Sequence, residues 1–151
     1  MIMDERAEFC DATALNTGGA GTYLVGDVMD LEVARDIGAG HQMYLVIQVT
    51  TTATSGGSAT VAFKLASDSI AAIAADDTET IHLLTELIPV ATLAAGYQRV
   101  IPVPPEMSHV FERFLGVEQQ TAVAALTAGA INAFLTFDPP AFWNPNADGS
   151  N

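Results

Sequence analysis

The stretch "MYLVIQV", residues 43–49, decides the fold because aliphatic side chains occupy every second position, from Met43 to Val49. The alternation places Leu45, Ile47 and Val49 on one face of an extended strand and Val46 on the opposite face. Successive side chains of a strand point to opposite faces, so a period of two is typical of β-structure. The stretch therefore predicts a strand with one face in a hydrophobic core.

The same alternation recurs along the chain. It is clear in "TVAFKLA", "TIHLLTELI" and "AINAFLTF", and weaker candidates lie at residues 7–14, 23–31, 98–103 and 114–119. Glycine-rich turns separate these segments, and "SIAAIAADD", residues 69–77, has room for one or two helical turns. Parallel sheets need crossover helices that this pattern lacks. We therefore predict an all-β fold, an antiparallel β-sandwich or jelly roll of about eight strands.

Two segments give more detailed expectations. In "TIHLLTELI", residues 80–88, alternation places Ile81, Leu83 and Leu87 together on one face, with Leu84 on the other. In "YQRVIPVPP", Pro102 cannot donate a hydrogen bond to a neighbouring strand, so the strand at 98–103 is expected at a sheet edge or beside a bulge.

Composition indicates one domain of residues 1–138 with a C-terminal tail or arm, residues 139–151. Half of the 151 residues are apolar, and 18 acids against five bases give a net charge of −13. Such a balance repels nucleic acid and anionic lipid and favours basic protein surfaces. The N-terminus lacks the pattern of a signal peptide, and no apolar run has the roughly 18 residues of a membrane helix. We expect a protein made inside a cell, with no nucleic-acid or membrane partner.

Groups that could perform chemistry are few. The single cysteine, Cys10, excludes an intramolecular disulfide and is expected to be buried. His41, His82 and His109 are far apart and show no metal-ligand spacing, and the acids at 76–79 lack the pattern of a calcium loop. A carboxylate pair that meets only in space stays open. We predict no enzyme, no catalytic residue, no cofactor and no metal site.

Several apolar side chains fall on faces that a lone sandwich would leave exposed. Such residues suggest either cover by another subunit or burial by loops of the same chain. The tail is either a disordered terminus or an arm anchored by its two aromatic residues. The candidate interface residues are Tyr44, Val46, Leu84, Phe114, Phe134, Phe142 and Trp143.

Four segments, taken in their order along residues 1–137, resemble a known family. They are "MIMDERAEFCDATAL", "ARDIGAGHQMYLVIQVT", "GGSATVAFKLASDS" and the run from "ELIPVATLAAGYQRVIPVPP" through "ERFLGVEQQ" to "LTAGAINAFLTF". Together they resemble the jelly-roll capsid cement, or decoration, proteins of tailed bacteriophages. Gly116 departs from the pattern, because a larger and often basic residue is expected there, and the C-terminal extension is longer than expected.

The resemblance implies a structural virion protein without enzymatic activity. Such a protein is assembled in the host cytoplasm and binds the outer surface of an icosahedral capsid. Its partners would be the major capsid protein, whose subunits it bridges to stabilise the shell, and a second copy of itself, a dimer rather than a trimer. The alternative is a carbohydrate-binding jelly-roll module for host attachment.

Overall fold

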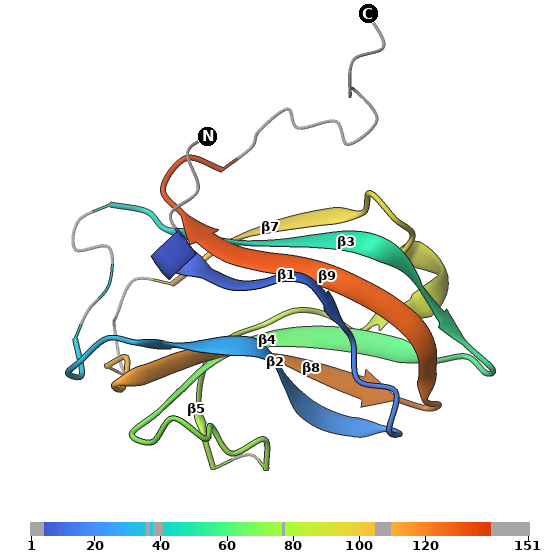
Figure 1. The fold of residues 1–151 in the computed structure, drawn as a ribbon, viewed down its shortest axis with the longest axis horizontal. Helices are drawn as coiled ribbons and strands as arrows, with labels where there is room; N and C mark the ends of the chain where they lie inside the picture. Colours follow the sequence, from blue (N-terminus) through green and yellow to red (C-terminus); the bar gives the residue numbers. More distant parts are fainter. Residues whose placement is uncertain (1–4, 36, 38–40, 77, 105–109, 140–151) are drawn as a thin grey trace, which may run out of the picture.

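The chain folds into two antiparallel β-sheets that pack face to face in the computed structural model (Figure 1). The structure describes residues 5–35, 37, 41–76, 78–104 and 110–139. The elements are η1 (Glu5–Ala7), β1 (Glu8–Ala14), β2 (Gly21–Asp30), β3 (Tyr44–Ser55), β4 (Thr60–Asp68), β5 (Thr80–Leu84), β6 (Ile88–Pro89), η2 (Val90–Thr92), β7 (Gln98–Pro102), β8 (Phe114–Ala122) and β9 (Leu126–Thr136). Among these residues no helix is long and apolar enough to cross a membrane.

The order of the strands is that of a jelly roll. Sheet A has the order β1-β9-β3-β7, and sheet B has the order β2-β8-β4-β5, with the short β6 pairing with β4. All strand pairs are antiparallel, and the chain crosses from one sheet to the other at most of its connections. Interleaving of this kind is what two Greek keys produce when they close into a double sheet. The predicted all-β sandwich is confirmed.

The core lies between the sheets and is built by the alternation seen in the sequence. Leu45, Ile47 and Val49 of β3 point inward toward Phe63 and Leu65 of β4, and all five are buried. Full burial of one such side chain contributes about 1.5–3 kcal/mol relative to its exposed state. The strand at Gln98–Pro102 forms one edge of sheet A, so the edge position expected from Pro102 is confirmed.

The segment 80–88 does not form one continuous strand as its alternation suggested. A register shift in the pairing of β4 with β5 puts Ile81 opposite Ala66 and Leu83 opposite Leu65. Ile81 therefore lies on the outer face of sheet B with Leu84, while Leu83 is in the core. At Thr85 the backbone N–H donates to Phe63 O (2.9 Å) and the hydroxyl accepts from Phe63 N (2.9 Å). The side chain thus replaces a ladder bond, and β5 ends there.

The connection between β4 and β5 forms a strap, residues 69–76 with Thr78 and Glu79, on the outer face of sheet B (Figure 1). It contains no helix, contrary to the turns that we considered for residues 69–77. The Asp68 carboxylate accepts hydrogen bonds from the N–H groups of Ile70 and Ala74, which holds the backbone in non-helical bends.

The strap explains the glycine at position 116. Ile73 of the strap is buried against sheet B, where Gly116 pairs with Ala66. A Cβ added at Gly116 would lie 2.8 Å from Cδ1 of Ile73 and 2.9 Å from Cδ1 of Leu24. The larger residue expected there from the family pattern would displace the strap.

A buried charge cluster fixes the second end of the strap. Lys64 Nζ lies 3.4 Å from Glu79 Oε1 and 3.8 Å from Glu118 Oε2, and the three side chains are 3%, 0% and 0% exposed. Lys64 and Glu118 are directly opposite each other on β4 and β8. Glu79, one of the acids at 76–79, is therefore buried and holds the strap against the sheet.

Candidate functional site

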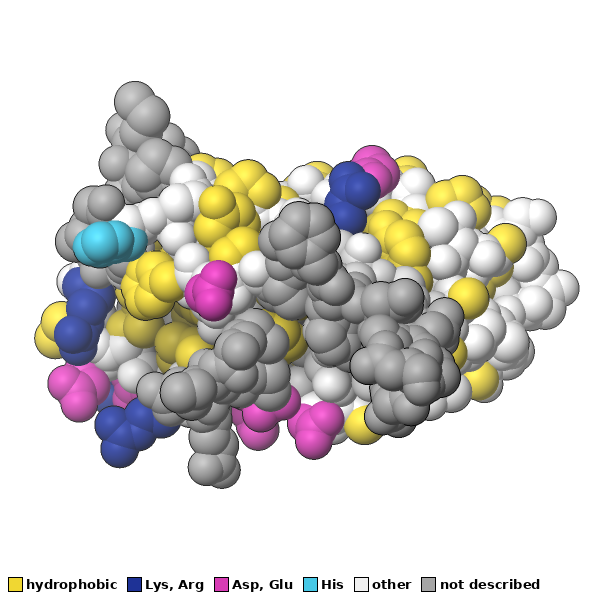
Figure 2. Space-filling model, turned by 90° about the horizontal axis from the view of Figure 1, so that it is seen from above, with side chains coloured by type: hydrophobic (Ala, Val, Ile, Leu, Met, Phe, Trp, Pro, Cys, Tyr) yellow, Lys and Arg dark blue, Asp and Glu magenta, His cyan; other side chains and the backbone are white. Residues whose placement is uncertain are grey.

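Among the residues that the structure describes, no charged residue lies at one end of the sandwich. Residues 12–26, 42–63, 87–98 and 119–137 contain no Asp, Glu, Lys or Arg. These four runs include the connections β1–β2, β3–β4, β6–β7 and β8–β9, which meet at the same end of the sandwich (Figure 1). Figure 2 shows the same segregation on one face, where no acidic or basic side chain appears at the right-hand end.

A hollow of about 320 Å³ extends this uncharged end onto the outer face of sheet B. It lies beyond the part of the face that the strap covers. Leu84 and Leu87 form its apolar rim, and both are more than half exposed. Its lining residues, all uncharged, are Gly21, Thr22, Ala62, Leu84, Thr85, Leu87, Gln120, Thr121 and Ala122.

We call this combination the neutral surface: the hollow, the turns at 15–20, 56–59 and 123–125, and the segment 90–97. Hydrogen bonds hold its turns in place. The Ser55 hydroxyl donates to Ala125 O (2.6 Å), which joins the β3–β4 turn to the β8–β9 turn. The buried Gln119 amide accepts from Asn16 N (2.8 Å) and donates to Asn16 O (3.0 Å), which fixes the β1–β2 turn. A surface fixed in this way is suited to docking because little of it must be ordered on binding.

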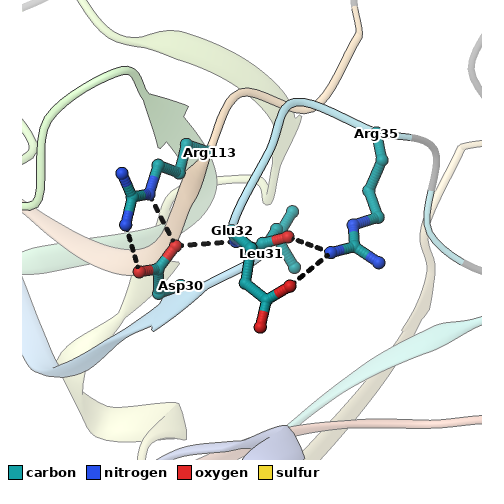
Figure 3. Close-up of polar contacts among 5 residues, drawn as sticks. All are labelled: Asp30, Leu31, Glu32, Arg35 and Arg113. Carbon is teal, nitrogen blue, oxygen red and sulfur yellow. Dashed lines mark hydrogen bonds and ion pairs between the residues drawn. The ribbon is translucent and has the colours of Figure 1, made fainter.

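The opposite end of the sandwich carries paired charges (Figure 3). The Arg113 guanidinium donates two hydrogen bonds to the Asp30 carboxylate, at 2.9 and 2.8 Å, which joins the end of β2 to the start of β8. These bonds, together with one from Glu32 N, lower the pKa of Asp30 to about 2. Arg35 donates to Leu31 O and lies 3.6 Å from Glu32 Oε2. The charges here stabilise the β2–β3 connection.

A second hollow, of about 330 Å³, opens at this charged end. Met29, Met43 and Leu135 line it, and the same side chains pack against the core. The hollow is therefore the open mouth between the two sheets, and flexible methionines fill irregular space of this kind.

The structure places the candidate interface residues in different environments. Leu84 lies on the neutral surface and is exposed, as expected. Val46 and Phe134 are only 0% and 2% exposed, so the single chain already buries them, which was the second of the two alternatives, and a partner is not needed to cover them. Tyr44 and Phe114 are half-buried. Phe142 and Trp143 lie outside the described residues.

Val46 and Phe134 are neighbours on the outer face of sheet A. They face each other across β3 and β9, and Phe134 also pairs with Glu8 of β1. Alternation predicted this face correctly but could not predict that it is covered.

The side chains that could perform chemistry have structural roles where they are described. Ser67 Oγ and His82 Nε2 are 2.7 Å apart, and the His82 ring stacks on Phe111. His41 lies edge-on to Phe137, and His109 falls outside the described residues. Cys10 is buried, as expected, and burial raises the pKa of its thiol to about 11. In the part of the chain that the structure describes, no three His, Cys, Asp or Glu side chains are grouped to hold a metal ion.

The fold and the surface define a jelly-roll sandwich with one uncharged, apolar end. The family model described as Bbp16 matches residues 9–135, so the chain belongs to the Bbp16 family. A comparison with curated proteins found no match.

Proposed function

We propose that this chain is a cement, or decoration, protein of a tailed-phage capsid. It binds the outside of the icosahedral shell through its neutral surface and bridges subunits of the major capsid protein. The observation that carries the proposal is the segregation of charge: a chain of net charge −13 has one end formed by four uncharged runs. Without fixed charges to desolvate, that end can be buried against a protein at low cost.

The apolar part of the neutral surface supplies the attraction. Leu84 and Leu87 stand beside a concave area lined by small residues, which a projecting side chain of the shell can enter. Removing such apolar area from water contributes about 25 cal/mol per Å² before the costs of association. The same contact repeated by icosahedral symmetry reinforces the shell even where each copy binds weakly. The protein acts as a dimer, so that each unit joins two sites.

The aromatic side chains favour docking to protein over the carbohydrate-binding alternative. Sugar-binding sandwiches place aromatic rings on an exposed groove. Among the described Phe, Trp and Tyr residues, only Phe137 is largely exposed, and it lies at the charged end. A single ring does not make such a groove.

Co-sedimentation with capsids tests the proposal. Shells of the phage that encodes the chain, stripped of this protein, are mixed with the wild type, with Leu84→Asp and with Val33→Asp. Leu84 and Val33 are 55% and 60% exposed, so both substitutions should leave the fold intact. Val33 lies in the β2–β3 connection at the charged end and is the matched control.

We expect the wild type and Val33→Asp to sediment with shells and Leu84→Asp to remain largely in the supernatant. Burying an unpaired carboxylate in the interface would account for that loss. Wild-type protein that fails to bind shells would disprove the proposed function. Loss of binding in Val33→Asp, with normal binding by Leu84→Asp, would place the docking site at the other end.

A further inference from the structure

The turn between β8 and β9 has a strained backbone at Val123. The N–H of Ala124 donates to Ala122 O at 2.9 Å, a bond between residues two apart, and Val123 at the centre has φ of 73°. A three-residue turn with this bond and a positive φ is the rare form of the γ-turn. A β-branched residue at positive φ is an outlier, because its Cβ substituents crowd the backbone.

Nothing in the turn requires a valine for folding. Glycine adopts positive φ without strain, and asparagine tolerates it better than valine does. The neighbouring turn shows the opposite choice: a Cβ added at Gly57 would lie 2.9 Å from Cβ of Ala124, so the residue there is small enough to let the two turns approach. The strain at Val123 is therefore a local cost that the fold does not explain.

The Val123 side chain also projects into solvent. It is 76% exposed, the highest value among the exposed large apolar side chains described. It directly follows Thr121 and Ala122, which line the hollow of the neutral surface. Val123 therefore strains the backbone and gains almost no stability from burial, which is typical of a residue kept for binding.

From this position we infer that Val123 is a projecting contact residue, which inserts into an uncharged, apolar pocket of the major capsid protein. The inference rests on the proposed function, because the shell is the partner. The run of residues 119–137 brings no charge near the tip, so the complementary pocket needs apolar walls and no counter-charge. The γ-turn leaves the side chain exposed, and the hydrogen bond from Ser55 to Ala125 O supports this turn from the adjacent β3–β4 turn.

Two substitutions separate the strain from the contact. Val123→Gly removes both the strain and the side chain, whereas Val123→Ala leaves the positive φ and removes only the two methyl groups. We expect Val123→Gly to raise the midpoint of thermal unfolding by about 2–4 °C, and Val123→Ala to raise it by less, because alanine loses the branching but keeps a Cβ at the positive φ. Both should weaken binding to stripped shells about 10- to 100-fold, the value of burying one valine side chain.

Ala12→Gly is the matched control. Ala12 is also exposed and has a positive φ of 44°, but it lies in β1 and belongs neither to the hollow nor to the turns of the neutral surface. Its substitution should stabilise the fold without affecting binding. Wild-type protein that does not bind shells would defeat the proposed function itself. Wild-type binding that both Val123 variants retain in full would overturn this inference alone, as would a Val123→Gly variant that unfolds at a lower temperature than the wild type.

Discussion

Replacing Lys64 with methionine tests whether the buried cluster holds the strap to sheet B. Methionine keeps most of the apolar stem and removes the ammonium group from between Glu79 and Glu118. Both carboxylate side chains are completely buried, so each would lose the opposite charge that stabilises it. Removing one partner of a buried ion pair costs about 3–5 kcal/mol, a large share of the roughly 5–15 kcal/mol of a typical domain.

The exposed pair of Arg99 and Glu86 provides the control. Its atoms are closer, at 2.7 Å, but the side chains are 44% and 57% exposed, so water already solvates both charges. Arg99→Met should therefore cost about 0–1 kcal/mol. If the distance between the charges alone set the loss of stability, Arg99→Met would be the more destabilising variant. Burial predicts instead that Lys64→Met is the more destabilising.

Urea unfolding at pH 7 and thermal unfolding measure the difference. Lys64→Met should lower the melting midpoint by about 6–20 °C, and Arg99→Met by less than about 4 °C. A third variant with Lys64→Met, Glu79→Leu and Glu118→Leu should recover most of the loss, because the buried carboxylates that faced Lys64 are then gone as well. Equal losses in Lys64→Met and Arg99→Met would refute the reasoning, and so would a triple variant no more stable than Lys64→Met.

Three further predictions concern separate parts of the fold. NMR titration should give Asp30 a midpoint near pH 2; since its folded pKa is below its unfolded value, Arg113 stabilises the fold above about pH 4, and the deficit of Asp30→Asn should fade as pH drops toward 2. Gly116→Ala should cost about 1–3 kcal/mol in urea unfolding, and this cost should be smaller in an Ile73→Ala background if the clash is with the strap. Phe134→Ala should cost about 3–5 kcal/mol, whereas a loss below about 1 kcal/mol would show that its burial contributes little.

Alternation of apolar residues was enough to predict the strands and the fold class, because the two faces of each strand have different environments. It predicted the inward face of β3, and the missing N–H of Pro102 predicted the edge position of the strand that contains it. It failed at β5, where a register shift moves Ile81 to the outer face. A shift of this kind depends on pairing with β4 and leaves no local signal in residues 80–88.

Contacts on the outer faces of the sheets also could not be predicted from the sequence. Nothing local indicates that Ile73 packs over Gly116, or that Lys64 meets a carboxylate 15 residues later in the chain. Glu79 was grouped with Asp76 by proximity in sequence, although one of the two is buried and the other exposed. Such contacts depend on how a connection folds back, which the pattern of strands does not determine.

The neutral surface, by contrast, could have been found from the sequence. Its four uncharged runs, the longest of 22 residues from 42 to 63, are visible in the chain, and each spans a connection between predicted strands. Turns are usually polar and often charged because they are solvated. Several uncharged turns in a strongly acidic chain would have indicated a shared end with a special environment.

Under the proposed function, segregating charge in this way reconciles two requirements of a protein that docks on a shell. A net charge of −13 keeps free copies apart in solution, since like charges repel over about a Debye length, roughly 8 Å at physiological ionic strength. The same charge spread evenly would have to be desolvated wherever the protein docked. Here the charged residues lie outside the four uncharged runs. Free copies therefore still repel one another, while the uncharged end can approach another protein. In this arrangement, raising the salt concentration should weaken repulsion between copies more than it weakens the docking contact.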